Sequence, residues 1–303
     1  MEPLADRIAR GDPLLLDGAM GTELLRQGLT PGECPELLNV TRPDVLEGIA
    51  RAYVEAGADL ILTNTFGGST AKLAPYGLEQ RMHELNEAGV CLARRAAGGR
   101  AYVAASCGPS GRLLKPYGDT DPDELLDGFR AQMECLLAAG VDALCIETTI
   151  DLNEALLLIR AARDASSDIP VTATMTFDPT PRGFVTVMGV TIEQAARRLP
   201  DAGADAVGSN CGNGIDHMVA IAREFRRHTD GPLIIQSNAG LPEIRDGLAV
   251  YAETPDFMAA RIPELLDIGV TLIGGCCGTT PHHIHAFRNA LRKRGHSAFP
   301  PAP

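Results

Sequence analysis

Eight short apolar runs alternate with amphipathic segments along nearly all of the 303-residue chain, and this alternation restricts the fold more than any other feature. Each run is rich in aliphatic and β-branched residues, is continuously apolar, and is bounded by glycine or proline. Strands that are buried on both faces of a parallel sheet have this pattern. We therefore predict strands at Leu14–Asp17, Leu60–Thr65, Tyr102–Ser106, Ala143–Thr148, Val171–Phe177, Ala206–Cys211, Leu233–Ser237 and Leu272–Cys277.

The segments between these runs have the spacing of amphipathic helices. Val45 and Ile49 share one face of such a segment, and Thr191 with Gln194 has the spacing of a capping box at the start of another. Eight strand–helix units in a chain of this length predict a (β/α)8 barrel that forms a single domain over residues 1–303. A doubly wound open sheet is the alternative.

A four-fold repeat places polar residues at the ends of alternate strands. Four times a helix ends in a similar tetrapeptide whose glycine suits the left-handed conformation that terminates helices, at Ala56–Asp59, Ala139–Asp142, Ala202–Asp205 and Ile268–Thr271. The predicted strands that follow are the second, fourth, sixth and eighth, and side chains from alternate strands form common layers in a (β/α)8 barrel. The barrel mouth should therefore contain the seventh and eighth residues after each glycine, which are Asn64, Thr65, Glu147, Thr148, Asn210, Cys211, Cys276 and Cys277.

Three of these residues have the chemistry of a metal site. Cys276 and Cys277 are adjacent within Gly274–Gly278, and a regular strand would point them to opposite faces. The flanking glycines allow the backbone to leave the strand conformation, and Cys211 reaches the same depth from the sixth strand. Three thiolates with an open fourth position are typical of a catalytic zinc site. The alternative is that these cysteines pack as small apolar residues.

The other cysteines and a histidine cluster do not suggest chemistry. We assign packing roles to Cys34, Cys91, Cys107, Cys135 and Cys145. The ligand spacing of a zinc finger is absent. We therefore expect a solvent-exposed first turn of the last helix at His282, His283 and His285.

A glycine-rich turn at Asp17–Gly21 follows the first strand and enters a helix. Such a turn offers its backbone N–H groups as hydrogen-bond donors to a bound anion. The loop is too short for a P-loop and lacks the P-loop lysine, so we do not expect it to bind a nucleotide. The expected ligand of the turn is a carboxylate. We predict that it is held by Gly18, Ala19, Met20 and Gly21. Asp17 and Glu147 would receive an ammonium group, although each could instead cap a helix or support a neighbour by hydrogen bonding. With Asn64 and Asn210 in the wall, these features predict a pocket for a zwitterionic amino acid beside a thiolate-bound zinc.

Composition narrows the classes of partner. The formal net charge is −12, from 27 Lys and Arg against 39 Asp and Glu, which disfavours nucleic-acid binding. There is no apolar stretch of the roughly 20 residues that a membrane span needs, and the N-terminus lacks the apolar core of a signal peptide. We therefore expect a cytoplasmic protein with no membrane partner and with reduced cysteines.

Four motifs resemble the homocysteine S-methyltransferase family, in order and over essentially the whole chain: DGAMGTE at 17–23, TNTFGGS at 63–69, GSNCG at 208–212 and GGCCGTTP at 274–281. The resemblance implies a (β/α)8 barrel that transfers a methyl group to the thiol of homocysteine and forms methionine. It implies zinc (Zn2+) bound by Cys211, Cys276 and Cys277. It also implies that the DGAMG turn and Glu147 hold the homocysteine backbone.

The resemblance also bears on the methyl donor. The betaine-dependent branch binds its trimethylammonium group with aromatic side chains, but Gly67 and Thr148 stand here where that branch has tyrosines, and the chain has no Trp. The TNTFGGS motif and ETTID at 147–151 resemble the homocysteine-binding half of cobalamin-dependent methionine synthase. The folate, cobalamin and activation domains of that enzyme do not fit in 303 residues. We therefore expect a methylated corrinoid (methylcobalamin) as donor, supplied in trans by a corrinoid protein.

Other possibilities stay open. A sulfonium, either S-methylmethionine or S-adenosylmethionine, is the main rival donor, and a zinc-binding scaffold without chemistry is the non-enzymatic alternative. A thiol redox protein would need an exposed CxxC pair, which the sequence lacks. Because a corrin ring is wide, the barrel mouth must stay open to it, and we expect the loop Asp178–Gly189 to border that opening.

Overall fold

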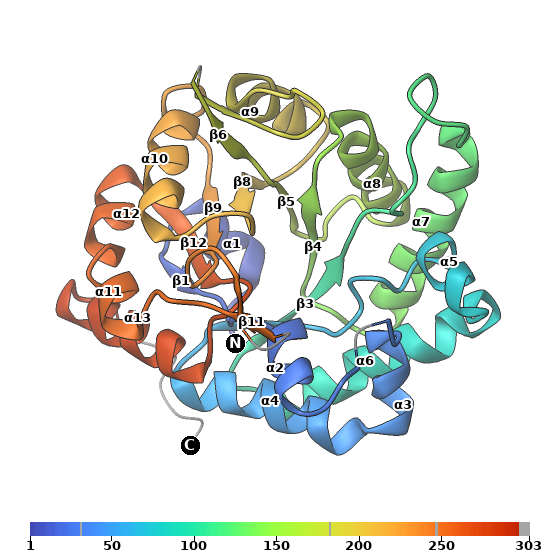
Figure 1. The fold of residues 1–303 in the computed structure, drawn as a ribbon, viewed down its shortest axis with the longest axis horizontal. Helices are drawn as coiled ribbons and strands as arrows, with labels where there is room; N and C mark the ends of the chain where they lie inside the picture. The colour runs from blue at the N-terminus through green and yellow to red at the C-terminus, as the bar shows by residue number, and fades with distance from the viewer. Residues whose placement is uncertain (31, 182, 246–247, 297–303) are drawn as a thin grey trace.

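The eight apolar runs form one parallel sheet that curls into a barrel in the computed structural model, which describes residues 1–30, 32–181, 183–245 and 248–296 (Figure 1). Hydrogen bonding orders the strands β1–β12–β9–β8–β5–β4–β3–β2, and a parallel bridge between Leu16 and Leu60 joins the two ends. The strands are β1 (Leu14–Leu15), β2 (Leu60–Leu62), β3 (Tyr102–Cys107), β4 (Ala143–Thr149), β5 (Val171–Met175), β8 (Ala206–Asn210), β9 (Leu233–Ser237) and β12 (Val270–Gly275). The (β/α)8 barrel is confirmed, and the open-sheet alternative is wrong.

The helices surround the barrel because each buries one apolar face against the strands (Figure 1). Thr191 and Gln194 form the predicted capping box at the start of α9. The helices are α1 (Leu4–Ala9), α2 (Gly21–Arg26), α3 (Leu38–Thr41), α4 (Pro43–Ala56), α5 (Thr70–Leu73), α6 (Met82–Ala97), α7 (Pro122–Ala138), α8 (Leu152–Ala165), α9 (Ile192–Asp201), α10 (Ile215–Arg226), α11 (Pro255–Ala259), α12 (Ile262–Ile268) and α13 (Pro281–Lys293). Three short 3-10 helices are η1 (Pro35–Leu37), η2 (Ala74–Tyr76) and η3 (Glu79–Arg81).

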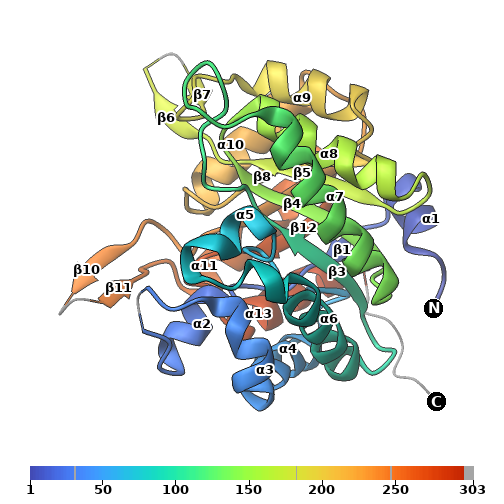
Figure 2. The ribbon, with the colours of Figure 1, turned by 90° about the vertical axis from the view of Figure 1, so that its right-hand side faces the viewer.

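The barrel interior is filled at one end and hollow at the other. Leu4 and Ile8 of α1 pack against inward-facing strand residues such as Leu14, Leu60 and Leu272, so α1 plugs the end where the strands begin. Two hairpins project on the opposite side, as Figure 2 shows. These are β6–β7 (Asp178–Thr180, Gly183–Val185) and β10–β11 (Glu243–Arg245, Leu248–Val250). The loop expected to border the opening therefore forms the β6–β7 hairpin, although its residue 182 lies outside the described residues.

The four-fold repeat of the sequence has a structural counterpart at the amino end of the barrel. All four glycines, Gly57, Gly140, Gly203 and Gly269, have positive φ angles, as their helix-terminating role predicts. Two residues further on, three of the four copies have an aspartate. Each carboxylate accepts the amide N–H of the preceding strand at 2.7–2.9 Å and pairs with an arginine of a surrounding helix, in the sets Asp59–Leu15–Arg288, Asp142–Val103–Arg94 and Asp205–Val171–Arg163. We call these sets Arg–Asp clamps.

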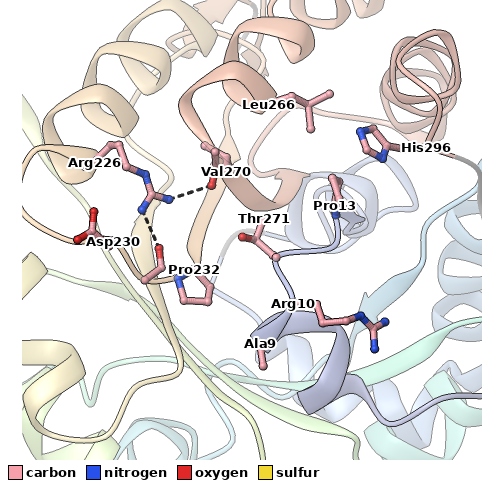
Figure 3. Close-up of a pocket in the computed structure, with 13 residues that line it drawn as sticks. Ala9, Arg10, Pro13, Arg226, Asp230, Pro232, Leu266, Val270, Thr271 and His296 are labelled. Atoms are coloured by element: carbon pink, nitrogen blue, oxygen red, sulfur yellow. Dashed lines mark hydrogen bonds between the residues drawn. The ribbon is translucent and has the colours of Figure 1, made fainter.

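The fourth copy of the repeat has no aspartate, because Thr271 occupies its position. Arg226 of α10 still takes the place of the clamp arginine, but it donates to backbone carbonyls that include those of Gly231 and Gly269. A pocket of about 530 Å³ lies here, lined by Arg226, Thr271 and residues of α1 (Figure 3). The fourth copy therefore differs from the other three, and the pocket beside it lies between α1, the residues before β9 and the first residues of β12.

Candidate active site

Three cysteine thiols converge at the carboxyl ends of β8 and β12. The Sγ atoms of Cys211, Cys276 and Cys277 all lie within 4.8 Å of one another, and those of Cys211 and Cys277 are 3.8 Å apart. Strand β12 ends at Gly275, so both adjacent cysteines lie in the turn beyond the strand, where they need not point to opposite faces. Cys211 follows β8 with a φ of 61°, a left-handed conformation that is unusual for a residue other than glycine.

Strand β9 aligns the two cysteine turns because it lies between β8 and β12 in the sheet. The amide of Cys211 donates to the Gln236 carbonyl at 3.2 Å, and the amide of Cys276 donates to the Ser237 carbonyl at 2.7 Å. Both acceptors are at the carboxyl end of β9. The parallel sheet therefore sets the depth of the cysteines on both neighbouring strands.

The three thiols interact strongly with one another. Hydrogen bonds from Cys276 and Cys277 lower the pKa of the Cys211 thiol to about 3. The hydrogen bond with Cys211 contributes most to raising the pKa of Cys277, which reaches about 12. Three thiols this close together therefore oppose the build-up of more than one negative charge unless a cation compensates it.

The geometry of the cluster fits a zinc ion. Two thiolates bound to zinc at about 2.3 Å with tetrahedral angles lie about 3.8 Å apart, which is the separation of the Cys211 and Cys277 sulfurs. Soft sulfur ligands also suit zinc better than magnesium or calcium. Within the described residues, this is the one cluster of three or more His, Cys, Asp or Glu side chains whose ligand atoms lie close enough to hold a metal.

A cavity of about 360 Å³ lies beside the thiols at the mouth of the barrel. The structure brings nearly all of the predicted site residues to its wall: Asp17, Gly18, Ala19, Met20, Gly21, Asn64, Glu147, Cys211, Cys276 and Cys277. Asn210 is the exception among them, because it is fully buried behind the wall. Its side-chain oxygen accepts the amide N–H of Thr148 at 2.7 Å, and its Nδ2 donates to the Thr148 hydroxyl at 2.7 Å.

Three carboxylates line this cavity without a cationic partner, and the sequence had predicted two of them, Asp17 and Glu147. Asp17 and Glu147 are 2% and 8% exposed, and none of the described residues that line the cavity is Lys, Arg or His. Asp17 Oδ2 accepts the Leu62 amide at 2.8 Å, whereas its Oδ1 is buried without a partner in the described chain. Burial raises the pKa of Asp17 well above its usual value and that of Glu147 to about 7. A cation such as an ammonium group would offset this burial.

The alternative capping role is wrong for both carboxylates. The N-cap of α2 is Met20, with no side-chain cap, and the N-cap of α8 is Asp151, whose carboxylate accepts the Asn153 amide. Glu147 instead accepts the Ser106 hydroxyl. Neither carboxylate is therefore used to cap a helix. The remaining lone pairs of Asp17 and Glu147 can accept hydrogen bonds from a ligand.

The glycine-rich turn offers fewer amides to an anion than the sequence predicts. The Ala19 N–H donates to the Thr279 hydroxyl at 3.1 Å, so it is already occupied. The Tyr53 hydroxyl donates to the Ala19 carbonyl at 2.8 Å and holds the turn from behind. Within the described residues, the amides of Met20 and Gly21 have no protein acceptor. These two amides are available to a carboxylate in the cavity.

Sequence reasoning missed several cavity residues. Glu36 comes from η1, is buried, and accepts the Gly67 amide at 2.6 Å. Ser106 and Gln236 are each the last residue but one of an odd-numbered strand of the barrel, so a search for polar residues near the ends of all eight strands would have found both. Phe66 directly follows the predicted second strand and is the only aromatic side chain among the described lining residues.

Two minor predictions are wrong. His283 is buried rather than exposed, because it completes a capping box with Thr280 and its Nε2 contacts the Glu253 carbonyl at 3.1 Å. Cys91 is exposed on α6 rather than packed.

Within the described residues, no helix is both long and apolar enough to cross a membrane.

Comparison with known proteins identifies close similarities. The family model described as homocysteine S-methyltransferase matches residues 14–291. The chain is 35% identical to methionine synthases of Mycobacterium leprae (strain TN) and Mycobacterium tuberculosis (strain ATCC 25618 / H37Rv), over 99% and 96% of this chain and 26% and 25% of those proteins. It therefore spans about a quarter of the length of these relatives.

Solved structures show the same likeness. The homocysteine methyltransferase MmuM from Escherichia coli, in its metallated form, superimposes with a TM-score of 0.76 at 26% identity, over 92% of this chain and 96% of that one. Its oxidized form gives a TM-score of 0.77 at 25% identity, with the same coverage.

Proposed function

The chain belongs to the homocysteine S-methyltransferase family, and we propose that it transfers a methyl group to the thiol of homocysteine, forming methionine, at a zinc site held by Cys211, Cys276 and Cys277. One observation carries the proposal. Three sulfurs within 4.8 Å of one another adjoin a cavity whose wall contains buried carboxylates, Asp17 and Glu147 among them, without a cationic partner. This arrangement suits a substrate that has both a thiol and an ammonium group.

The cysteines would supply the charge that the reaction needs. A free thiol has a pKa of about 8.5 and is mostly protonated at neutral pH; a bound zinc ion supplies the Lewis acid that ionises a coordinated thiol. Three cysteine thiolates carry a formal charge of −3, one more than a divalent cation neutralises. This excess negative charge would keep the substrate sulfur electron-rich for attack on a methyl group.

The cavity would orient the amino-acid end of the substrate. Asp17 Oδ1 and Glu147 would accept the ammonium N–H groups, while the amides of Met20 and Gly21 would donate to the carboxylate. Asn64 would contribute to the wall, and Asn210 would act indirectly by holding Thr148. These contacts would fix the direction from which the thiol reaches the cysteines.

We further propose a methylated corrinoid as the donor, carried by a corrinoid protein. The 35% identity to mycobacterial methionine synthases over almost the whole chain supports this choice. Binding of a quaternary ammonium donor needs several aromatic faces, whereas Phe66 is the one aromatic residue among the described residues of the cavity wall. We therefore expect betaine to be a poor donor.

A donor panel tests the proposal. Zinc-loaded protein and homocysteine are incubated with methylcobalamin, S-methylmethionine, S-adenosylmethionine or betaine, and methionine is measured by mass spectrometry. We expect turnover with methylcobalamin and almost none with betaine. Turnover with a sulfonium but not with the corrinoid would contradict the proposed donor and keep homocysteine as acceptor. No methionine with any of the four would contradict the proposed reaction.

A further inference from the structure

Two neighbouring turns at the barrel mouth share a strained backbone conformation. Thr148, which follows Glu147, and Cys211, which follows Asn210, both have a φ of 61°. Among the described residues, no others except glycines have a positive φ. This conformation is unfavourable for a residue with a Cβ atom, and above all for the β-branched Thr148. It persists only where the surrounding structure holds it in place.

At Thr148 the strain belongs to a bulge in β4. Between its pairings with Ala173 and Met175 of β5, strand β4 advances three residues where β5 advances two. The extra residue lies in the segment that contains Glu147 and Thr148, and a bulge of this kind changes the direction in which side chains point. The bulge therefore sets the direction of Glu147, which lines the cavity.

One buried amide, the side chain of Asn210 at the end of β8, joins this bulge to the cysteine cluster. Its Oδ1 accepts the Thr148 N–H and the Thr174 hydroxyl, each at 2.7 Å. Its Nδ2 donates to the Thr148 hydroxyl at 2.7 Å and to the Cys276 sulfur at 3.8 Å. A backbone N–H can only donate, so the bond from Thr148 fixes which end of the amide is oxygen and leaves the nitrogen facing the sulfur.

We infer that Asn210 is a positioning residue that holds the zinc ligand Cys276 and the bulge carrying Glu147 in one arrangement. The inference rests on the proposed function, because it takes Cys276 as a zinc ligand and Glu147 as an acceptor of the substrate ammonium group. A side-chain amide has two donors and two acceptor lone pairs, and Asn210 uses all four. Zinc binding and amino-acid binding therefore depend on the same side chain.

Each contact of Asn210 bears on a different ligand. Three thiolates carry one negative charge more than zinc neutralises, and the hydrogen bond to Cys276 disperses part of this charge. Groups that orient metal ligands typically change metal affinity 10–100-fold when they are removed. The contacts with Thr148 bear instead on the substrate, since they hold the strained bulge that directs Glu147.

Two substitutions separate these contacts. Asn210→Ala removes all four hydrogen bonds. Asn210→Asp keeps the two that the oxygen accepts, and the Thr148 hydroxyl can donate to the second carboxylate oxygen, so the donor to Cys276 is the group that is lost. Asn86→Ala is the matched control, because Asn86 is equally buried and its Nδ2 also donates to two acceptors, neither of which lines the cavity.

Zinc affinity and methionine affinity are the two readouts, after native circular dichroism has been checked for every variant. Competition with a chromophoric chelator gives the first, and calorimetry on the zinc-loaded protein gives the second. We expect zinc binding to weaken about 10-fold in Asn210→Ala and in Asn210→Asp. Methionine binding should weaken in Asn210→Ala and stay near the wild-type level in Asn210→Asp. Asn86→Ala should change neither.

The inference is overturned by any of three results. Wild-type zinc affinity in Asn210→Ala would remove the role at Cys276, even if Asn210→Asp is weakened, because the new charge alone would explain that loss. Wild-type methionine affinity in Asn210→Ala would remove the role at the bulge. Equal losses in Asn86→Ala would reduce both effects to packing. If the wild-type protein binds no zinc, the proposed function fails first and the inference falls with it, so zinc bound by the wild type distinguishes the two failures.

Discussion

Buried carboxylates occur at both ends of the barrel, but their surroundings are opposite. At the amino end, Asp59 pairs with Arg288, and both side chains are only 1% exposed. At the carboxyl end, Asp17 and Glu147 face a cavity whose described wall contains no cation. The first pair connects β1, β2 and α13 and stabilises the closed barrel. The second pair is costly to bury unless a ligand supplies the positive charge.

This contrast shows how one fold separates stability from chemistry. In (β/α)8 barrels, the carboxyl ends of the strands hold the active site and the amino ends mainly serve stability. Here the same four-fold repeat serves both ends. The second residue after the glycine forms the Arg–Asp clamps at the amino end in three copies, and the seventh and eighth residues after it provide the thiols and polar groups at the carboxyl end. Substitutions at the two ends should therefore change different properties.

The largest effect is expected from the thiols. Cys276→Ala and Cys277→Ala should lose zinc and abolish methyl transfer, because each removes one of three metal ligands, while the barrel remains folded. Metal analysis by mass spectrometry and circular dichroism check this. Cys91→Ala, which removes an exposed thiol on α6, is the control and should keep one zinc per chain. Full zinc occupancy in either of the first two variants would show that the ligands are wrongly assigned.

The next effect is expected at the opposite end. Arg288→Met leaves Asp59 buried without its partner and should lower the free energy of unfolding by about 3–5 kcal/mol. Arg94→Met removes a partly exposed clamp, so we expect a loss of about 1 kcal/mol or less. Urea denaturation measures both. Equal losses in the two variants would contradict the view that burial makes the Asp59–Arg288 clamp critical.

A smaller effect is expected at the carboxylates of the mouth. Glu147→Gln should weaken homocysteine binding by about 1.5–3 kcal/mol, the scale of a hydrogen bond to a charged group, and should leave zinc bound. Isothermal titration calorimetry gives the affinity, and metal analysis gives the zinc content. An unchanged dissociation constant would remove Glu147 from the ammonium site.

The pH dependence of ligand binding at this site tests the role of Glu147 independently. Because burial raises the pKa of Glu147 to about 7, its carboxylate becomes protonated as the pH falls through 7, and attraction for an ammonium group decreases. Methionine is the suitable probe, since it has no thiol proton to lose. Its affinity for the wild-type protein should fall below pH 7, and Glu147→Gln should lose this dependence. The same decline in both proteins would assign it to another group.

The smallest effect is expected at the incomplete fourth clamp. Thr271→Asp would place a carboxylate near Arg226 and should raise the free energy of unfolding by about 1 kcal/mol. Thr271→Asn is the matched uncharged control and should give less. Urea denaturation measures the difference. A less stable Thr271→Asp protein would show that this position does not accept the clamp seen in the other three copies.

Much of the fold could be predicted because its signals are local. The apolar runs located all eight strands, and the glycine of each repeat located the left-handed helix end before a strand. Aligning the repeats also placed Glu147 and the three cysteines at one depth, and the structure brings them to one cavity. The same alignment included Asn210, but the pattern could not show that this side chain is fully buried and holds Thr148.

The sequence by itself determined the alternation of strands and helices, and it determined which residues end the even-numbered strands, because periodicity and glycine conformation act within a few residues. Only the tertiary structure decided which distant groups meet. Asp59 and Arg288 are 229 residues apart in the chain, and Glu36 and Ser106 reach the cavity from segments without a repeat. Closure of the barrel brings the first strand beside the last, and this brings Asp59 and Arg288 together. Such contacts leave no periodic signal, since they depend on packing between elements rather than on spacing within one.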